Sequence, residues 1–264
     1  MNTPLDSSWL VTGAAQGLGR AIALGAARRG AAHVTVADVD AAAAEQVAAE
    51  VVAAGAEATV LVVDLRRPDE VRGMVDDAVD AMGGLDTLVN NAGILDVTFQ
   101  SDATFDTLSE DSWDAVMAVN LKAVWLATQR AAPILRRSTR SPSVINAASV
   151  SGMTGYPSPA YAASKGAVIQ LTRSCAISLA PDVRCNSFSP GSFDTPMARH
   201  RIATAADPDA QLRQMTGNHL IPRAGDPDEL ANVVCFLASS EASFLTGANV
   251  PVDGGTMAWR GTRA

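Results

Sequence analysis

Short apolar segments alternate with helix-forming segments along almost the whole chain, and this alternation constrains the fold more than any other feature. Segments typical of strands cover residues 9–12, 33–37, 58–63, 87–90, 143–148, 183–187 and 249–252. Segments typical of helices cover residues 20–29, 41–54, 68–82, 111–132, 159–179 and 226–239. Strands that alternate with helices pair in parallel, because each helix carries the chain back to the same end of the sheet. The pattern predicts an α/β protein with a doubly wound parallel sheet and helices on both faces.

No linker, repeat or low-complexity segment interrupts this alternation, so we expect a single domain over residues 1–264. The apolar runs are too short to span a membrane, and the first residues lack the basic and apolar segments of a signal peptide. A net charge of −8 argues against nucleic acid and anionic membranes as partners. Cys175, Cys185 and Cys235 lack metal-ligand spacing and are typical of free thiols. These features predict a cytoplasmic protein without a metal site.

Residues suited to ligand binding directly follow six of the predicted strands. They are Gly13, Asp38, Asp64, Asn91, Ser149 and Pro190. In a doubly wound sheet, ligands bind beyond the carboxyl ends of the strands. We therefore expect these residues to meet at one edge of the sheet and to form one site.

The turn after the first predicted strand contains Gly13, Gly17 and Gly19, and a helix follows it. A glycine-rich turn between strand and helix lets backbone N–H groups approach a pyrophosphate at the helix N-terminus. The spacing, Gly-x-x-x-Gly-x-Gly, differs from the commonest dinucleotide-binding pattern, and a purely structural turn is the alternative.

Asp38 follows the second predicted strand, about 20 residues past the glycines. A carboxylate at this place accepts hydrogen bonds from the adenosine ribose of NAD and repels the 2′-phosphate of NADP. Val39 and Asp40 come next, so no Arg stands beside Asp38 to receive that phosphate. The sequence therefore favours NAD as the cofactor. The alternative is that Asp38 caps the helix expected over residues 41–54.

Tyr161 and Lys165 lie four residues apart at the start of the helix expected over residues 159–179, so they share one helix face. An ammonium group one turn away favours the phenolate, and we expect it to lower the pKa of the Tyr161 phenol from its ordinary value of about 10. Such a pair moves a proton on or off a hydroxyl group. Ser149 precedes the pair and is placed to hydrogen-bond the same substrate oxygen. The alternative is an ordinary helix start with a solvated Lys.

Taken together, these motifs resemble those of the short-chain dehydrogenase/reductase family, in its compact single-domain branch. They are Thr-Gly-x-x-x-Gly-x-Gly at 12–19, Asn-Asn-Ala-Gly at 90–93, Asn120, Ser149, Tyr-x-x-x-Lys at 161–165 and Pro-Gly-x-x-x-Thr at 190–195. The resemblance covers nearly the whole chain and implies a Rossmann-type fold of about seven strands.

The resemblance also implies a role for each motif residue. Tyr161 would be the catalytic acid/base, and Lys165 would lower its pKa and hold the nicotinamide ribose. Ser149 would polarise the substrate oxygen. Asn120 would position a water in the proton relay. Asp64 and Leu65 would flank the adenine, while Phe193 and Thr195 would contact the nicotinamide carboxamide and phosphate. The substrate-binding residues would be Ser149, Ser151, Tyr156 and Tyr161. The cofactor-binding residues would be Gly13, Gln16, Gly17, Leu18, Gly19, Asp38, Val39, Asp64, Leu65, Asn91, Ala92, Gly93, Tyr161, Lys165, Pro190, Phe193 and Thr195.

The chain departs from the family pattern in two places. Ser149 lies one residue closer to Tyr161 than expected, which makes Ser151 a competitor for its role. The segment 94–110 is longer than usual and acidic, and it either shapes the substrate mouth or is a solvated surface excursion. Residues 193–221 correspond to a lid over the substrate, with a plain helical insertion as the alternative.

The helices expected over residues 111–132 and 159–179 are apolar on more than one side. A single apolar stripe is enough to cover a sheet, so a second one predicts a partner helix. We expect a homotetramer or a homodimer built on these two helices.

The sequence therefore predicts an NAD-dependent oxidoreductase that interconverts a small secondary alcohol and a ketone, with Tyr161 as the acid/base. Two alternatives are an NADP-linked ketone reductase, which Asp38 disfavours, and a sensor or scaffold that binds NAD without turnover. The complete set of Asn120, Ser149, Tyr161 and Lys165 disfavours the sensor, which does not need a proton relay.

Overall fold

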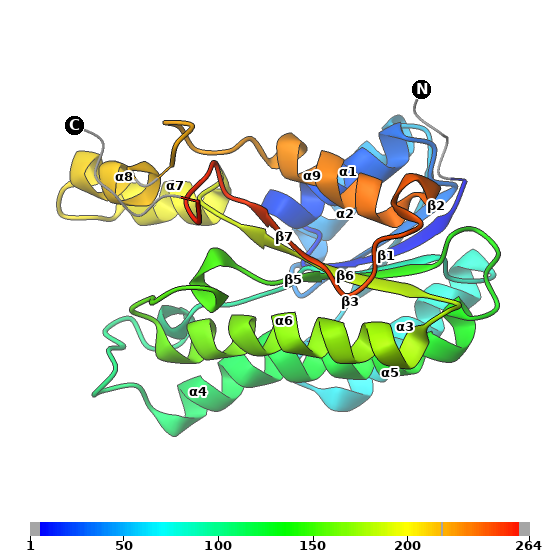
Figure 1. The fold of residues 1–264 in the computed structure, drawn as a ribbon, viewed down its shortest axis with the longest axis horizontal. Helices are drawn as coiled ribbons and strands as arrows, with labels where there is room; N and C mark the ends of the chain where they lie inside the picture. Colours follow the sequence, from blue (N-terminus) through cyan, green and yellow to red (C-terminus); the bar gives the residue numbers. More distant parts are fainter. Residues whose placement is uncertain (1–5, 218, 259–264) are drawn as a thin grey trace.

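The computed structural model describes residues 6–217 and 219–258. The domain predicted over residues 1–264 and the lid predicted over residues 193–221 both include positions outside these ranges. Seven parallel strands form one sheet in the order β3-β2-β1-β4-β5-β6-β7 (Figure 1). The strands are β1 (Ser8–Thr12), β2 (His33–Asp38), β3 (Glu57–Val62), β4 (Thr87–Asn90), β5 (Ser143–Ala147), β6 (Arg184–Pro190) and β7 (Asn249–Val252). The predicted doubly wound parallel sheet is confirmed.

Helices cover both faces of this sheet (Figure 1). One face carries α1 (Gly17–Arg28), α2 (Ala41–Ala53) and α9 (Pro227–Ala238). The other carries α3 (Pro68–Met82), α5 (Ala123–Leu135) and α6 (Pro159–Leu179), with α4 (Glu110–Met117) packed on α6. Buried aliphatic side chains fill most of both layers, as is typical of a sheet covered on both sides. Strand β6 is an exception, with buried polar residues such as Asn186 and Ser187. Among the described residues, no helix is both long and apolar enough to cross a bilayer.

The helix expected over residues 111–132 is present as a continuous helical segment, but it contains a π-helical turn that the sequence did not predict. Helix α4 ends at Met117, a π-helical turn covers Ala118–Lys122 (η2), and α5 continues from Ala123. Asn120 lies inside the turn, where the extra residue per turn lets its side chain reach two neighbouring segments. Turns of this kind occur mostly at functional sites.

Smaller differences have local causes. Helix α1 begins at Gly17 rather than at residue 20, because the glycine turn leads directly into the helix. Strand β6 continues to Pro190 because its last residues pair with β7. After β6, α7 (Pro196–Ala203) and α8 (Pro208–Thr216) lie together at one end of the molecule, in the region predicted as a lid (Figure 1).

On the helices expected over residues 111–132 and 159–179, fewer apolar residues are exposed to a partner than the sequence indicates. Val168 and Val124 are buried within the subunit, where they pack together in a small cluster. Trp125 and Ile177 remain exposed, at 46% and 81% of their surface. The exposed residues, rather than Val168, are therefore the ones open to a partner helix.

Candidate active site

One large cavity of about 600 Å³ lies beyond the carboxyl ends of the strands. Its volume falls in the range typical of cofactor and ligand sites. Most residues predicted to bind the cofactor line it: Gly13, Gln16, Gly17, Leu18, Gly19, Asp38, Val39, Asp64, Leu65, Asn91, Ala92, Gly93, Tyr161, Lys165, Pro190 and Thr195. Five of the six predicted strand-end residues thus meet at this cavity, and Ser149 is the exception.

The glycine turn leaves backbone N–H groups open to this cavity. Gln16, the residue before α1, makes no side-chain capping hydrogen bond, so the first N–H groups of the helix keep their capacity to bind an anion. Gly13 and Gly17 have left-handed backbone angles, with φ of 63° and 56°. A Cβ atom on Gly19 would lie 2.0 Å from the Gly13 carbonyl oxygen, so no other residue fits there. This cradle fits the pyrophosphate of a dinucleotide.

Asn91 fixes the shape of that turn from a neighbouring strand. Its amide Nδ2 donates to the carbonyl oxygens of Thr12 and Gly13, at 3.0 and 3.1 Å. The Thr12 hydroxyl in turn accepts hydrogen bonds from the N–H groups of Asn91 and Ala92. The segment after β4 therefore supports the turn after β1.

Asp38 borders the cavity at the end of β2 and also supports the glycine turn. Its Oδ2 accepts a hydrogen bond of 2.9 Å from the N–H of Ala15, and its Oδ1 accepts from the N–H groups of Val39 and Asp40. The residue that caps α2 is Asp40, whose Oδ1 accepts from the N–H of Ala43 at 3.1 Å. The capping role considered for Asp38 is therefore filled by Asp40.

Arg66, which the sequence analysis did not single out, lies at the wall of the cavity beside Asp64. Its guanidinium donates to both carboxylate oxygens of Asp64, at distances from 2.6 to 3.0 Å. This pairing lowers the pKa of Asp64. The guanidinium also lies over the ring of Phe99, 5.5 Å from its centre. Because Phe99 lies in the acidic segment 94–110, this part of the segment contributes to the cavity wall.

Tyr161 and Lys165 both line the cavity. Lys165 is buried, and its Nζ donates to the carbonyl oxygen of Ala147 at 2.7 Å and lies 5.8 Å from the centre of the Tyr161 ring. Burial lowers the pKa of Lys165 to about 8. Burial raises the pKa of Tyr161 to about 12, although a hydrogen bond from Ser149 favours the phenolate. The expected lowering of the phenol pKa is therefore absent here, because desolvation outweighs the neighbouring polar groups.

Asn120 is fully buried and braces the site from the π-helical turn. Its Oδ1 accepts from the N–H of Ile94 at 2.9 Å, and its Nδ2 donates to the Ile94 carbonyl and to the Ser164 hydroxyl. The Ser164 hydroxyl donates to the carbonyl oxygen of Tyr161 at 2.7 Å. Asn120 therefore links the segment at Ile94 to the helix that carries Tyr161.

Five of the residues assigned to the site do not line the cavity: Asn120, Ser149, Ser151, Tyr156 and Phe193. Phe193 packs in the core, and its ring lies against Gly225, where it leaves no room for a side chain. Ser151 is buried, and its N–H donates to the hydroxyl of Ser149. Ser149 rather than Ser151 contacts the Tyr161 phenol. Tyr156 lies beside Tyr161, with ring centres 6.1 Å apart, and its hydroxyl accepts a hydrogen bond from Arg201 on α7.

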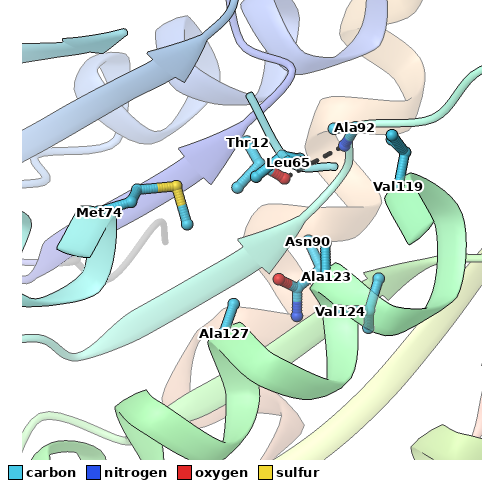
Figure 2. Close-up of a pocket in the computed structure, with 9 residues that line it drawn as sticks. All are labelled: Thr12, Leu65, Met74, Asn90, Ala92, Val119, Ala123, Val124 and Ala127. Atoms are coloured by element: carbon cyan, nitrogen blue, oxygen red, sulfur yellow. Dashed lines mark hydrogen bonds between the residues drawn. The ribbon is translucent and has the colours of Figure 1, made fainter. Parts of the chain in front are cut away.

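A second, much smaller cavity of about 10 Å³ lies behind the wall formed by Leu65, Ala92 and Val119 (Figure 2). Figure 2 shows it between β4 and α5, with the Thr12 hydroxyl bonded to the N–H of Ala92 at one side. This volume is close to that of a single water molecule, so it is too small for a ligand. Within residues 6–217 and 219–258, no group of three or more His, Cys, Asp or Glu side chains could hold a metal ion.

Comparison with known proteins gives matches over nearly the whole chain. Residues 13–257 match the protein family described as enoyl-(acyl carrier protein) reductase. The 3-oxoacyl-(acyl-carrier-protein) reductase FabG of Thermotoga maritima is 36% identical over 250 residues, which cover 93% of this chain and 96% of that protein. Cyclopentanol dehydrogenase of Comamonas testosteroni is 36% identical over 252 residues, covering 95% and 96%. The structure of levodione reductase superimposes with a TM-score of 0.88 at 31% identity, covering 96% of this chain and 99% of that one.

Proposed function

The chain belongs to the short-chain dehydrogenase/reductase family of oxidoreductases, and on that premise we propose that it interconverts a secondary alcohol and a ketone with NAD as cofactor. The observation that carries this proposal is that Tyr161 and the buried Lys165 line the same cavity as the glycine cradle. An acid/base group is useful there because hydride transfer at a carbonyl carbon needs a matching proton transfer at its oxygen.

The protein's own residues bind the cofactor and move the proton. The N–H groups of the glycine turn hold the pyrophosphate, and Asp38 accepts hydrogen bonds from the adenosine ribose. The nicotinamide ring supplies or accepts the hydride when the cofactor is bound. The Tyr161 phenol gives its proton to the ketone oxygen in reduction, and the phenolate takes it back in oxidation. The Ser149 hydroxyl orients the same oxygen.

The raised pKa of Tyr161 affects how the rates of reduction and oxidation depend on pH. With a pKa of about 12, the phenol stays protonated throughout the neutral range, which suits it to act as the acid in ketone reduction. Alcohol oxidation needs the phenolate, whose fraction grows tenfold with each pH unit below that pKa. The rate of oxidation should therefore rise with pH through the neutral range, while the rate of reduction depends little on pH there.

Two features support NAD rather than NADP. Asp38 places a carboxylate at the cavity wall, and Val39 beside it carries no charge. Among the cavity-lining residues, Arg66 is the cation closest to Asp38 in the sequence. Its guanidinium, however, donates hydrogen bonds to both carboxylate oxygens of Asp64. A 2′-phosphate would meet the Asp38 carboxylate, while the Nε and Nη2 groups of Arg66 are already bonded to Asp64. An NADP-linked reductase is the alternative, and a direct comparison of turnover with the two cofactors tests it.

A turnover assay on secondary alcohols and their ketones tests the function. Tyr161→Phe should lower kcat at least about 100-fold, because general acid/base catalysis contributes that much, while NAD binding is unchanged. In the wild type, oxidation should accelerate with rising pH through neutrality while reduction stays nearly constant, as the sign of the Tyr161 shift requires. Wild-type turnover in Tyr161→Phe would remove the mechanism.

Lys165→Met is the comparison variant and should weaken NAD binding as well as turnover, since Lys165 is assigned to the nicotinamide ribose. Tyr156→Phe removes the hydroxyl that Arg201 holds, and we expect it to change KM for the substrate rather than kcat.

We also propose that the protein assembles as a homodimer or homotetramer through α4, α5 and α6 and works in the cytoplasm. The exposed Trp125 and Ile177 support the assembly. The free thiols of Cys175, Cys185 and Cys235 support a reducing compartment.

A further inference from the structure

The first turn of α6, which carries Tyr161, has no capping group of its own. Pro159 lacks an N–H group, and the side chain of Ser158 makes no capping hydrogen bond. The N–H of Ala162 is bonded to the Ser158 carbonyl oxygen. The N–H groups of Ala160 and Tyr161 therefore need acceptors from elsewhere.

Asp96 supplies both acceptors from a segment 64 residues away. Its Oδ2 accepts from the N–H of Ala160 at 3.1 Å, and its Oδ1 accepts from the N–H of Tyr161 at 2.8 Å. The carboxylate is almost completely buried, with 1% of the residue exposed. Among the ion pairs of the described residues none includes Asp96, so the positive end of the α6 dipole is the partner of its charge.

The same segment is held from its other side by Asn120. Asp96 begins the short helix η1 (Asp96–Thr98), two residues after Ile94, whose N–H and carbonyl are both bonded to the Asn120 amide. Asn120 also reaches Tyr161 through the Ser164 hydroxyl. The backbone of Tyr161 is thus bound at its N–H by Asp96 and at its carbonyl oxygen by Ser164.

We propose that Asp96 is a positioning residue for the reaction, because its two hydrogen bonds fix the first turn of α6 and so the place of the Tyr161 phenol in the cavity. This role requires both oxygen atoms of the carboxylate, because each accepts one backbone hydrogen bond. In Asp96→Asn one of them becomes an N–H donor that opposes a backbone N–H group, although the side chain keeps its shape. In Asp96→Ala both acceptors are lost.

The kinetic test compares Asp96→Asn and Asp96→Ala with Asp102→Asn, which removes an exposed carboxylate from the same segment. Steady-state assays well below each variant's melting temperature should show kcat reduced about tenfold or more in both Asp96 variants, about 1.4 kcal/mol in the barrier. The Kd for NAD, measured by quenching of protein fluorescence, should stay within about twofold, and Asp102→Asn should match the wild type in both. A lower melting temperature with wild-type kcat would show a purely structural cap and overturn the proposal.

A second measurement needs no turnover and separates this inference from the proposed function on which it rests. The chain has two tyrosines, so in a Tyr156→Phe background the ultraviolet absorbance of phenolate reports Tyr161 alone. Adding Asp96→Asn should move its titration to lower pH, because a negative charge is lost and the loosened turn admits water. An unchanged titration overturns the proposal. If the wild type turns over no alcohol or ketone, the proposed function fails, and this titration still decides the role of Asp96.

Discussion

At the scale of single residues, Asp38 combines two tasks. Its carboxylate supports the glycine turn through the N–H of Ala15, and it borders the cavity at the proposed ribose site. A neutral side chain of the same shape keeps one acceptor for the turn and loses the charge. Asp38→Asn is therefore a sharper test of cofactor choice than a smaller residue.

We expect the wild type to prefer NAD to NADP by at least tenfold in kcat/KM, and Asp38→Asn to reduce that ratio severalfold. Two like charges about 4 Å apart at an effective dielectric constant near 20 repel by roughly 4 kcal/mol, and half of that exceeds the 1.4 kcal/mol of a tenfold preference. The measurement is kcat/KM with each cofactor at fixed substrate.

Asp40→Asn is the matched control, because Asp40 caps α2 and Asn caps a helix about as well as Asp. It removes a neighbouring charge that does not line the cavity, so the NAD preference should survive. A wild type that uses both cofactors with equal efficiency would exclude a role for Asp38 in selection.

Prediction from the sequence worked best for residues whose neighbours are local in the chain. Gly13, Asp38 and Lys165 are recognisable because each stands at the end of a strand or one helical turn from a partner. Asp96 was noticed only as part of an acidic segment, since its contacts with α6 join residues 64 positions apart. The phenol pKa was predicted with the wrong sign, because a sequence shows a neighbouring ammonium group and not the burial that outweighs it.

At the scale of elements, α6 presents two different surfaces. The side chain of Val168 is fully buried against Val124 and Ile169, whereas Ile177 is 81% exposed on the outer side of the same helix. Both residues are apolar, and the helical pattern of the sequence did not show which of them lies in the core and which lies at the surface. The π-helical turn at Asn120 escaped prediction for a similar reason, since it depends on bonds to Ile94 and Ser164 that only the fold creates.

We predict that Ile177→Asp shifts the protein to a smaller species in sedimentation at micromolar concentration while its circular dichroism is unchanged. The reason is that a charge at a covered helix face opposes association, and the same residue is free of the core within one subunit. Val52→Asp, at an exposed apolar position on α2 on the opposite face, is the control and should leave the assembly intact. A wild type that sediments as a monomer would contradict the predicted assembly.

At the scale of the whole molecule, the sequence predicted the order of strands and helices and the edge at which the site forms. These follow from one rule, that parallel strands joined by helices deliver their carboxyl ends to one side. The sequence did not predict where the segment 94–110 lies, because the length of a segment does not show whether it packs against the cavity or extends into solvent. The structure places part of it, including Phe99, along the cavity wall, while Phe105 is largely exposed.

The hydrogen bonds between Asn91 and the glycine turn also affect the order in which parts of the protein fold. The turn after β1 is completed by an amide 79 residues later, so it cannot take its final shape until β4 has paired with β1. Local helices form faster than contacts of such separation, since closing a long loop costs entropy before any contact repays it. In refolding from denaturant, far-ultraviolet ellipticity should therefore recover before the ability to bind NAD, read by stopped-flow fluorescence. Asn91→Ala should lengthen the interval between the two signals, and simultaneous recovery in the wild type would refute this order of events.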